Sequence, residues 1–128
     1  MADKITPRNI LHPKRKEKKI TLKNLDSVSS DNVSDALKQL YGNPGLVEGI
    51  KPICDTYKVA GRIRTVYTDS GDWGTIVKAI YESQKGEILF IKCSDETKAI
   101  WGELASVAAK EYGIKATIIY GASRDTMK

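Results

Sequence analysis

A chain of 128 residues with 41% hydrophobic and 29% charged residues has the size and composition of one soluble domain with its own core. Two cysteines and one histidine exclude a disulfide framework and a zinc site, and no apolar run reaches the roughly 20 residues that span a bilayer. We therefore predict a cytoplasmic protein with two reduced thiols, Cys54 and Cys93, and no membrane partner.

The basic character of the chain lies near its N-terminus. Residues 1–32 hold eight Lys and Arg against four Asp and Glu, and the densest run is PKRKEKK at residues 13–19. We interpret residues 1–31 as a basic N-terminal arm that lacks regular structure before about Asn24, because its apolar residues are sparse. A solvated arm is favoured over nucleic-acid contact, since no aromatic residues interleave with the lysines.

The first helix is predicted directly after this arm. Ser29, Ser30 and Asp31 are N-cap candidates for a helix that begins near Asn32, and GNPG at residues 42–45 stops it. Its apolar face, at helical spacing, consists of Val33, Ala36, Leu37 and Leu40.

The middle of the chain predicts strands around a second helix. LVEGIKPI at residues 46–53 indicates a strand or an extended segment, and VAGRIRTVYT at residues 59–68 alternates as a strand does. Asp72 is the cap candidate of the helix that follows. KGEILFIKC at residues 85–93 is a turn and then an apolar run typical of a strand buried on both faces. The apolar face of the helix after Asp72 is predicted to consist of Ile76, Val77, Ile80 and Tyr81. In the strand at residues 59–68, one face is predicted to hold Val59, Gly61, Ile63, Thr65 and Tyr67, and the other face Arg62 and Arg64.

Residues 94–113 show the clearest helical spacing, and Gly113 fits the position just after a helix. Gly102 lies inside this pattern, where glycine costs about 1 kcal/mol relative to alanine. Two interpretations have equal weight: one long helix, or a helix that begins near Gly102 and offers its first backbone amides to an anion. The long helix would direct Ile100, Leu104, Val107 and Ala108 to one side.

IKATIIYG at residues 114–121 predicts a further buried strand. From Val59 onward, strands and helices thus alternate, which predicts right-handed crossovers and a largely parallel sheet covered by helices. Ligands of such α/β sheets collect beyond the carboxyl ends of the strands. The loops CSDETK and GASRDT, at residues 93–98 and 121–126, follow two of these strands, and we expect them to face one crevice.

The GASRDT loop contains an adjacent pair of opposite charges. From the residues alone, a structural ion pair or a solvated loop is the favoured interpretation. In the functional alternative, Arg124 offers a planar fork of donors to a carboxylate or carbonyl oxygen, and Asp125 offers hard oxygen to a divalent cation such as Mg²⁺.

Several segments together resemble the RraA-like family, which includes 4-hydroxy-4-methyl-2-oxoglutarate aldolases and proteins labelled demethylmenaquinone methyltransferases. The specific block is AIWGELASVAAKEYGIKATIIYGASRDT at residues 99–126, a G-x-L-A turn followed by a glycine-small-x-Arg-Asp motif. Four shorter segments, which occur in family order, support the resemblance: VSDAL (33–37), AGRIRTV (60–66), GDW (71–73) and KGEILFI (85–91).

This resemblance implies an α/β fold, the layered swivelling (phosphohistidine-domain-like) α/β/β/α type, over residues 32–128, assembled as a homotrimer or a hexamer. It implies that Arg124 is catalytic and contacts a small 2-oxo acid substrate, and that Asp125 helps to hold Mg²⁺ or another divalent cation. The substrate carboxylate would bind the backbone amides of the G-x-L-A turn, which are those of Gly102, Glu103, Leu104 and Ala105.

The chain departs from the family pattern in two respects. Lys92 and Cys93 stand where many members place an aspartate and glycines, and Asp95 is a partial substitute. Members usually continue for several strands beyond the Arg-Asp motif, so we expect this chain to be a C-terminally truncated part of the family domain.

Three functions follow as hypotheses. The first is a Mg²⁺-dependent lyase that cleaves 2-oxo acids to pyruvate, as a 4-hydroxy-4-methyl-2-oxoglutarate aldolase or an oxaloacetate decarboxylase. The second is a non-catalytic regulator of ribonuclease activity. The third is an inactive fragment.

Overall fold

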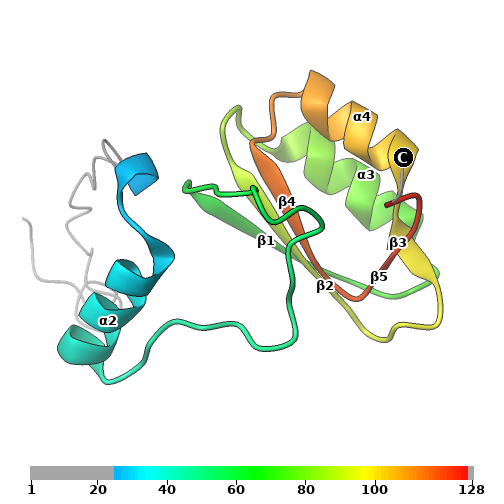
Figure 1. The fold of residues 1–128 in the computed structure, drawn as a ribbon. Helices are drawn as coiled ribbons and strands as arrows, with labels where there is room; N and C mark the ends of the chain where they lie inside the picture. Colours follow the sequence, from blue (N-terminus) through cyan, green and yellow to red (C-terminus); the bar gives the residue numbers. More distant parts are fainter. Residues whose placement is uncertain (1–24, 127–128) are drawn as a thin grey trace, which may run out of the picture.

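A computed structural model describes residues 25–126, and Figure 1 shows the course of the chain. The prediction that the arm lacks regular structure before Asn24 lies outside the described residues. The described part begins with a single 3₁₀ turn, η1 (Leu25–Ser27). None of the helices within residues 25–126 has the length and apolar content needed to cross a bilayer.

The predicted first helix is confirmed as α2 (Ser30–Tyr41), and its ends follow from its caps. The hydroxyl of Ser29 accepts a hydrogen bond from the Asn32 backbone N–H at 3.2 Å. At the other end Gly42 adopts φ +74°, and its N–H donates to the Lys38 carbonyl at 2.9 Å. No residue within α2 is buried.

The centre of the molecule is a parallel three-stranded sheet in the order β1 (Ile63–Thr68), β2 (Ile88–Cys93), β4 (Ala116–Tyr120). The helices α3 (Trp73–Glu82) and α4 (Glu103–Glu111) connect these strands. Right-handed crossovers that step in the same direction across a sheet place their helices on the same face, and Figure 1 shows α3 and α4 together on one side. The predicted alternation, and the gathering of these three strands in one sheet, are confirmed.

The strand register decides which side chains the two helices cover. Val66, Ile91 and Ile119 align across the sheet on the covered face, and Val66 and Ile91 belong to the hydrophobic core. The core is completed mainly by Ile76, Ala79, Ile80, Leu89, Ile100, Trp101, Ala105 and Ala109.

Among residues 25–126, no helix covers the opposite face of the sheet. It carries Ile63 and Tyr67 of β1, whose exposed fractions are 54% and 65%. The alternation predicted for residues 59–68 is therefore confirmed within β1, but the face that carries its large apolar residues is the uncovered one. β4 is only half-buried rather than fully buried, because it is the edge strand of this sheet.

The structure decides between the alternatives predicted for two segments. Residues 46–53 contain no strand, and the segment is irregular with a turn at residues 48–49. Residues 94–113 are not one helix: a loop leads into β3 (Ala99–Trp101), and α4 begins only at Glu103. The interpretation that placed the helix start near Gly102 is confirmed.

The buried faces of α4 and α3 also differ from the predicted faces. The face predicted for residues 94–113 was anchored on Ile100, which belongs to β3 and not to the helix. The buried residues of α4 are Ala105 and Ala109, whereas Leu104 and Val107 are 77% and 54% exposed. In α3, which Asp72 caps as predicted, Ile76, Ala79 and Ile80 are buried, while Val77 and Tyr81 remain exposed.

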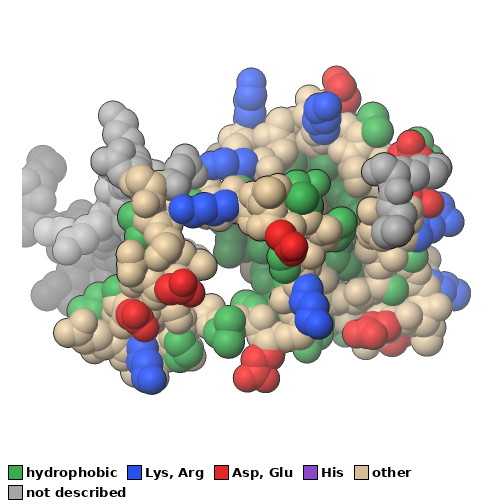
Figure 2. Space-filling model, in the orientation of Figure 1, with side chains coloured by type: hydrophobic (Ala, Val, Ile, Leu, Met, Phe, Trp, Pro, Cys, Tyr) green, Lys and Arg blue, Asp and Glu red, His purple; other side chains and the backbone are tan. Residues whose placement is uncertain are grey.

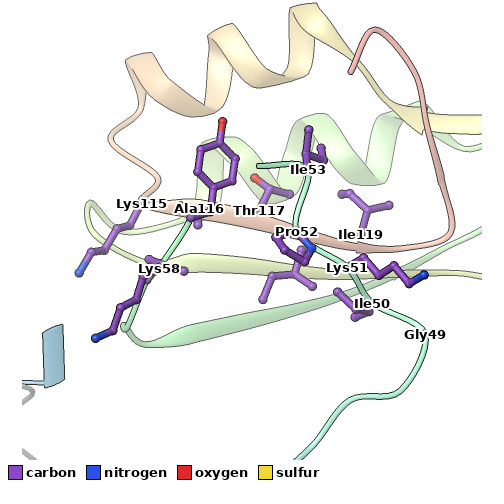
Figure 3. A pocket seen from close by; sticks show the side chains of 13 residues that line it. Gly49, Ile50, Lys51, Pro52, Ile53, Lys58, Lys115, Ala116, Thr117 and Ile119 are labelled. Carbon is purple, nitrogen blue, oxygen red and sulfur yellow. The ribbon is translucent and has the colours of Figure 1, made fainter. Parts of the chain in front are cut away.

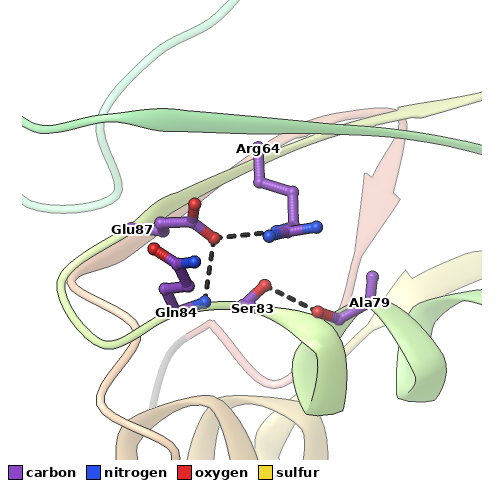
Figure 4. A network of polar contacts seen from close by, with 5 residues as sticks. All are labelled: Arg64, Ala79, Ser83, Gln84 and Glu87. Atoms are coloured by element: carbon purple, nitrogen blue, oxygen red, sulfur yellow. Dashed lines mark hydrogen bonds and ion pairs between the residues drawn. The ribbon is translucent and has the colours of Figure 1, made fainter.

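A buried glutamate joins β1, β2 and the end of α3, as Figure 4 shows. Oε2 of Glu87 accepts hydrogen bonds from Nε of Arg64 at 2.7 Å and from the Gln84 backbone N–H at 2.9 Å. Glu87 is 7% exposed. The hydrogen bond from Arg64, with that from Gln84, lowers the pKa of Glu87 below its ordinary value.

We expect Glu87→Ala to lower the free energy of unfolding at neutral pH by roughly 1–3 kcal/mol, because Nε of Arg64 and the Gln84 backbone N–H, both in part-buried hydrogen bonds, lose their shared acceptor. Glu82→Ala removes an exposed pair with Lys78 and serves as the control, with a change below about 0.5 kcal/mol. Chemical denaturation measures both. Since the folded pKa of Glu87 is depressed, its contribution is present above the unfolded pKa and is lost as pH falls through the folded pKa. If the difference in the free energy of unfolding between the wild type and Glu87→Ala does not decrease in acid, this role of Glu87 is contradicted.

Candidate active site

A small second sheet brings the two halves of the sequence motif together. β3 pairs in parallel with β5 (Ala122–Ser123), with Ala99 opposite Ala122 and Trp101 opposite Ser123. The Arg124 backbone N–H continues this pairing by donating to the Trp101 carbonyl at 3.0 Å. Residues that follow β3 and residues that follow β5 therefore lie next to each other.

Gly102 lies directly against the Arg-Asp pair. A Cβ at this position would lie 3.2 Å from Cγ of Arg124 and 3.2 Å from Oδ2 of Asp125, closer than ordinary contact. The backbone of Gly102 is extended, with φ −169°, a conformation open to any residue. Glycine is thus favoured here by the lack of space, not by the backbone angle.

Two side-chain hydrogen bonds that the sequence analysis did not predict stabilise the start of α4. Nε1 of Trp101 donates to Oγ of Ser106 at 2.9 Å, and this hydroxyl donates to the Gly102 carbonyl at 2.9 Å. The Ser106 backbone N–H bonds the same carbonyl at 3.0 Å and forms the first turn of α4. The signal was a serine four residues after the glycine, the spacing at which a helical side chain reaches back to a carbonyl.

The first turn of α4 has the properties of an anion site. The backbone amides of Leu104 and Ala105 precede the first intrahelical donor, Ser106, and so have no intrahelical acceptor. Leu104 and Ala105 have apolar side chains, so they can donate hydrogen bonds to an anion only through their backbone N–H groups. The side chains of Glu103 and Leu104 are exposed, and that of Ala105 is buried.

Arg124 and Asp125 form a solvent-accessible pair. Nε of Arg124 lies 3.6 Å from Oδ2 of Asp125, and their side chains are 64% and 35% exposed. Asp125 has φ +61°, a left-handed conformation that aspartate and asparagine tolerate better than other non-glycine residues. Water screens an ion pair of this kind, so it stabilises the fold little and leaves both groups accessible to a ligand.

The loop after β2 is tied to the loop after β1 through Asp95. Its carboxylate accepts hydrogen bonds from the Thr97 hydroxyl and the Thr97 N–H, and from Ser70 and Ser94 at 3.1 and 3.2 Å. The side chain and then the backbone of Thr97 are the main causes that lower the pKa of Asp95 to about 2. This loop leads directly into β3 and so contributes to the position of Gly102.

In an NMR titration of side-chain carboxyls, we expect Asp95 to titrate near pH 2, well below the ordinary value of about 3.9. The hydrogen bonds of the folded loop are thus retained as pH falls until Asp95 protonates. Thr97→Val removes the side-chain hydrogen bond that lowers the pKa of Asp95 most, and should therefore raise that pKa. Thr75→Val, which removes the equivalent bond to Asp72, is the control and should leave Asp95 unchanged. An ordinary Asp95 pKa in the wild type would contradict the loop geometry.

We expect Gly102→Ala to displace Arg124 and to lower the free energy of unfolding by about 1 kcal/mol, since alanine is a clearly poorer N-cap than glycine. The side-chain Nε–Hε signal of Arg124 should shift in NMR spectra, while that of Arg64, held by Glu87, should stay as an internal control. An unchanged Arg124 signal would mean that the contact is not formed in solution.

The comparisons with known proteins identify a family for most of the chain. The family model RraA-like, described as Aldolase/RraA, matches residues 30–128. The chain belongs to the RraA-like family. A protein of Halalkalibacterium halodurans named "Putative 4-hydroxy-4-methyl-2-oxoglutarate aldolase" is 38% identical over 94 residues, which are 73% of this chain and 43% of that protein. An uncharacterized protein of Methanocaldococcus jannaschii is 39% identical over 83 residues, which are 62% of this chain and 39% of that protein.

Two solved structures in the comparison have related folds. An uncharacterized protein from Pseudomonas syringae matches with a TM-score of 0.68 at 27% identity, over 78% of this chain and 46% of that one. The RNA-processing inhibitor RraA from Thermus thermophilus matches with a TM-score of 0.60 at 26% identity, over 73% of this chain and 58% of that one. The α/β arrangement with parallel sheets is thus shared with RraA-like structures, and the chain spans about two fifths of the length of the curated relatives.

Proposed function

We propose that this RraA-like chain carries the substrate-binding part of a Mg²⁺-dependent lyase that cleaves 2-oxo acids to pyruvate. The observation that carries the proposal is the contact of Gly102, at the N-terminus of α4, with Arg124 and Asp125. An anion site, a forked cation and a carboxylate thus meet at one point. The proposal extends to the layered swivelling α/β/β/α fold, of which the described residues supply the three-stranded sheet with α3 and α4 and the small sheet of β3 and β5.

Each group has a separate role in this chemistry. The first-turn amides of α4, at the positive end of the helix dipole, bind the substrate carboxylate. Arg124 directs its guanidinium to the 2-oxo oxygen, where negative charge develops as the carbon–carbon bond breaks and a pyruvate enolate forms. The exposure of Arg124 leaves this fork accessible to the substrate.

The residues present fit a weakly held divalent cation. Mg²⁺ in enzymes is commonly bound by one or two carboxylates, with water and substrate as the other ligands. Asp125 would supply one carboxylate, and Glu103 in the G-x-L-A turn is the candidate for a second. Among residues 25–126, no group of three or more His, Cys, Asp and Glu side chains is placed where it could hold a metal ion. When bound, the cation would supply Lewis-acid stabilisation of the enolate oxygen.

We expect Arg124→Lys to reduce kcat/KM for pyruvate release at least tenfold, about 1.4 kcal/mol, because lysine keeps the charge and loses the fork. Asp125→Asn should abolish the dependence on Mg²⁺, and asparagine suits this variant because it tolerates the left-handed backbone. Arg62→Lys, an exposed arginine of another segment, is the matched control.

The assay measures pyruvate release from 4-hydroxy-4-methyl-2-oxoglutarate and from oxaloacetate, with Mg²⁺ and with chelator. It uses this chain as it stands and the chain extended by the remaining part of the Halalkalibacterium relative. Release that depends on Mg²⁺ and falls in both site variants supports the lyase. If neither form releases pyruvate above the chelated control, the lyase proposal is wrong.

The second candidate is a non-catalytic regulator of ribonuclease activity. The observation that favours it is the structural similarity to the RNA-processing inhibitor RraA. A regulator would slow RNA cleavage by a purified endoribonuclease of the same cell, and Arg124→Lys would leave that inhibition intact. The lyase proposal predicts the opposite result: Arg124→Lys loses pyruvate release, and neither the wild type nor the variant affects RNA cleavage.

A further inference from the structure

An apolar groove of about 750 Å³ runs along the edge strand β4, and its described lining includes none of the candidate active-site residues (Figure 3). The irregular segment from Gly49 to Val59 forms one wall, and residues 115–119 form the other. Figure 2 shows hydrophobic side chains gathered over the sheet in this region. Ile53 and Tyr57 of the lining are 66% and 70% exposed, so the described chain leaves this apolar surface open to water.

The outer edge of β4 presents backbone groups that the sheet does not use. The Lys115 N–H donates to the Glu87 carbonyl at 2.8 Å, so Lys115 and every second residue after it face β2. Ala116, Ile118 and Tyr120 therefore direct their N–H and C=O groups away from β2, because successive residues of a strand point to alternate sides. β4 is the last strand of its sheet, and among residues 25–126 no hydrogen bond reaches these outward groups. An open edge of this kind can accept one further strand.

The rim of the groove is basic. Lys51, Lys58 and Lys115 line the groove, and no acidic residue is among its described lining residues. Nζ of Lys115 donates to the Ala60 carbonyl at 2.7 Å, and this bond ties the segment that follows Lys58 to the start of β4. Figure 3 shows Lys58 near Lys115, at the start of β4, and Lys51 toward Ile119, near its end. A strand with a carboxylate at each end of an apolar centre therefore complements the groove in charge and in polarity.

Occupants from this chain itself fit the groove less well. Two β4 edges from two copies would bring the same lysines together, and like charges oppose such a pairing. The basic run at residues 13–19 has the same sign as the groove. The helix α2 bonds its own backbone groups and leaves no row of them to pair with an edge strand. An extended acidic segment of another protein meets none of these obstacles.

We propose that the open edge of β4 binds an extended acidic segment of a partner protein by strand addition. The backbone of that segment pairs with the outward groups of β4 and continues the sheet by one strand. Its apolar side chains lie in the groove against Ile53 and Tyr57. The carboxylates at its two ends face Lys51 and Lys58.

A capped synthetic peptide, added to the full 128-residue chain, tests the strand addition. It has glutamate at both ends and alternating valine and threonine between them, about seven residues in all, which spans the five residues of β4 at about 3.3 Å per residue. Its sequence reads the same in both directions, so either strand direction can form. We expect the peptide to slow amide hydrogen exchange at Ala116, Ile118 and Tyr120 at least about tenfold in NMR spectra. Thr117 and Ile119, whose N–H groups face β2, are the internal control and should exchange slowly with and without peptide.

A charge exchange tests the role of the two lysines. Lys51→Glu/Lys58→Glu should weaken binding of the glutamate peptide at least about tenfold, because like charges then meet at both ends. A second peptide with lysine at both ends should bind this variant more tightly than it binds the wild type. Lys98→Glu/Lys110→Glu, outside the groove, changes the net charge equally and should keep the wild-type affinity. Fluorescence anisotropy of labelled peptide measures the affinities, and circular dichroism shows that each variant is folded.

The exchange pattern also defines the results that overturn the proposal. Slow exchange at Ala116, Ile118 and Tyr120 without peptide means that this chain, or a second copy of it, already covers the edge. The same protection without peptide only in the chain extended by the remaining part of the Halalkalibacterium relative assigns the edge to the family domain itself. Binding of the peptide without protection of these amides excludes strand addition. Absence of binding up to about 1 mM peptide excludes an acidic strand as the occupant.

Discussion

The parallel pairing of β2 with both of its neighbours is the constraint on which the rest of the structure depends. Because β1 and β4 run in the same direction as β2, their carboxyl ends lie at one edge, and the loops that follow them are neighbours. Because both crossovers step in the same direction, α3 and α4 share one face. Leu89 and Ile91, both fully buried, are the centre of the core that results.

The candidate site depends on a smaller pairing of the same kind. β3 and β5 are short, yet the backbone bond from Arg124 to Trp101 extends their contact to the residues that carry chemistry. The Trp101–Ser106–Gly102 network then sets where α4 begins. The anion site and the charged pair are therefore held by backbone bonds and a buried tryptophan, while the groups offered to a ligand remain accessible.

Local signals in the sequence predicted much of this structure. Ser29, Asp72, Gly42 and Gly113 marked helix ends correctly, because a cap depends on a few neighbouring residues. The apolar run of β2 predicted a buried strand for the same local reason. The motif predicted that Gly102 and the Arg-Asp pair belong together, and the structure does bring them into contact. The roles of these residues toward substrate and metal remain predictions.

Other features depended on contacts between distant segments. Helical spacing over residues 94–113 could not show that residues 99–101 form a strand, because a strand this short exists only through its pairing with β5. Alternation in β1 could not show which face is covered, since the direction of the two crossovers decides that. By itself, the sequence determined both ends of α2, the start of α3, the glycine after α4, the parallel α/β order and the motif. Only the tertiary structure decided that α4 begins at Glu103, that Arg64 is held by Glu87, and that an apolar groove stays open, because each of these depends on long-range packing.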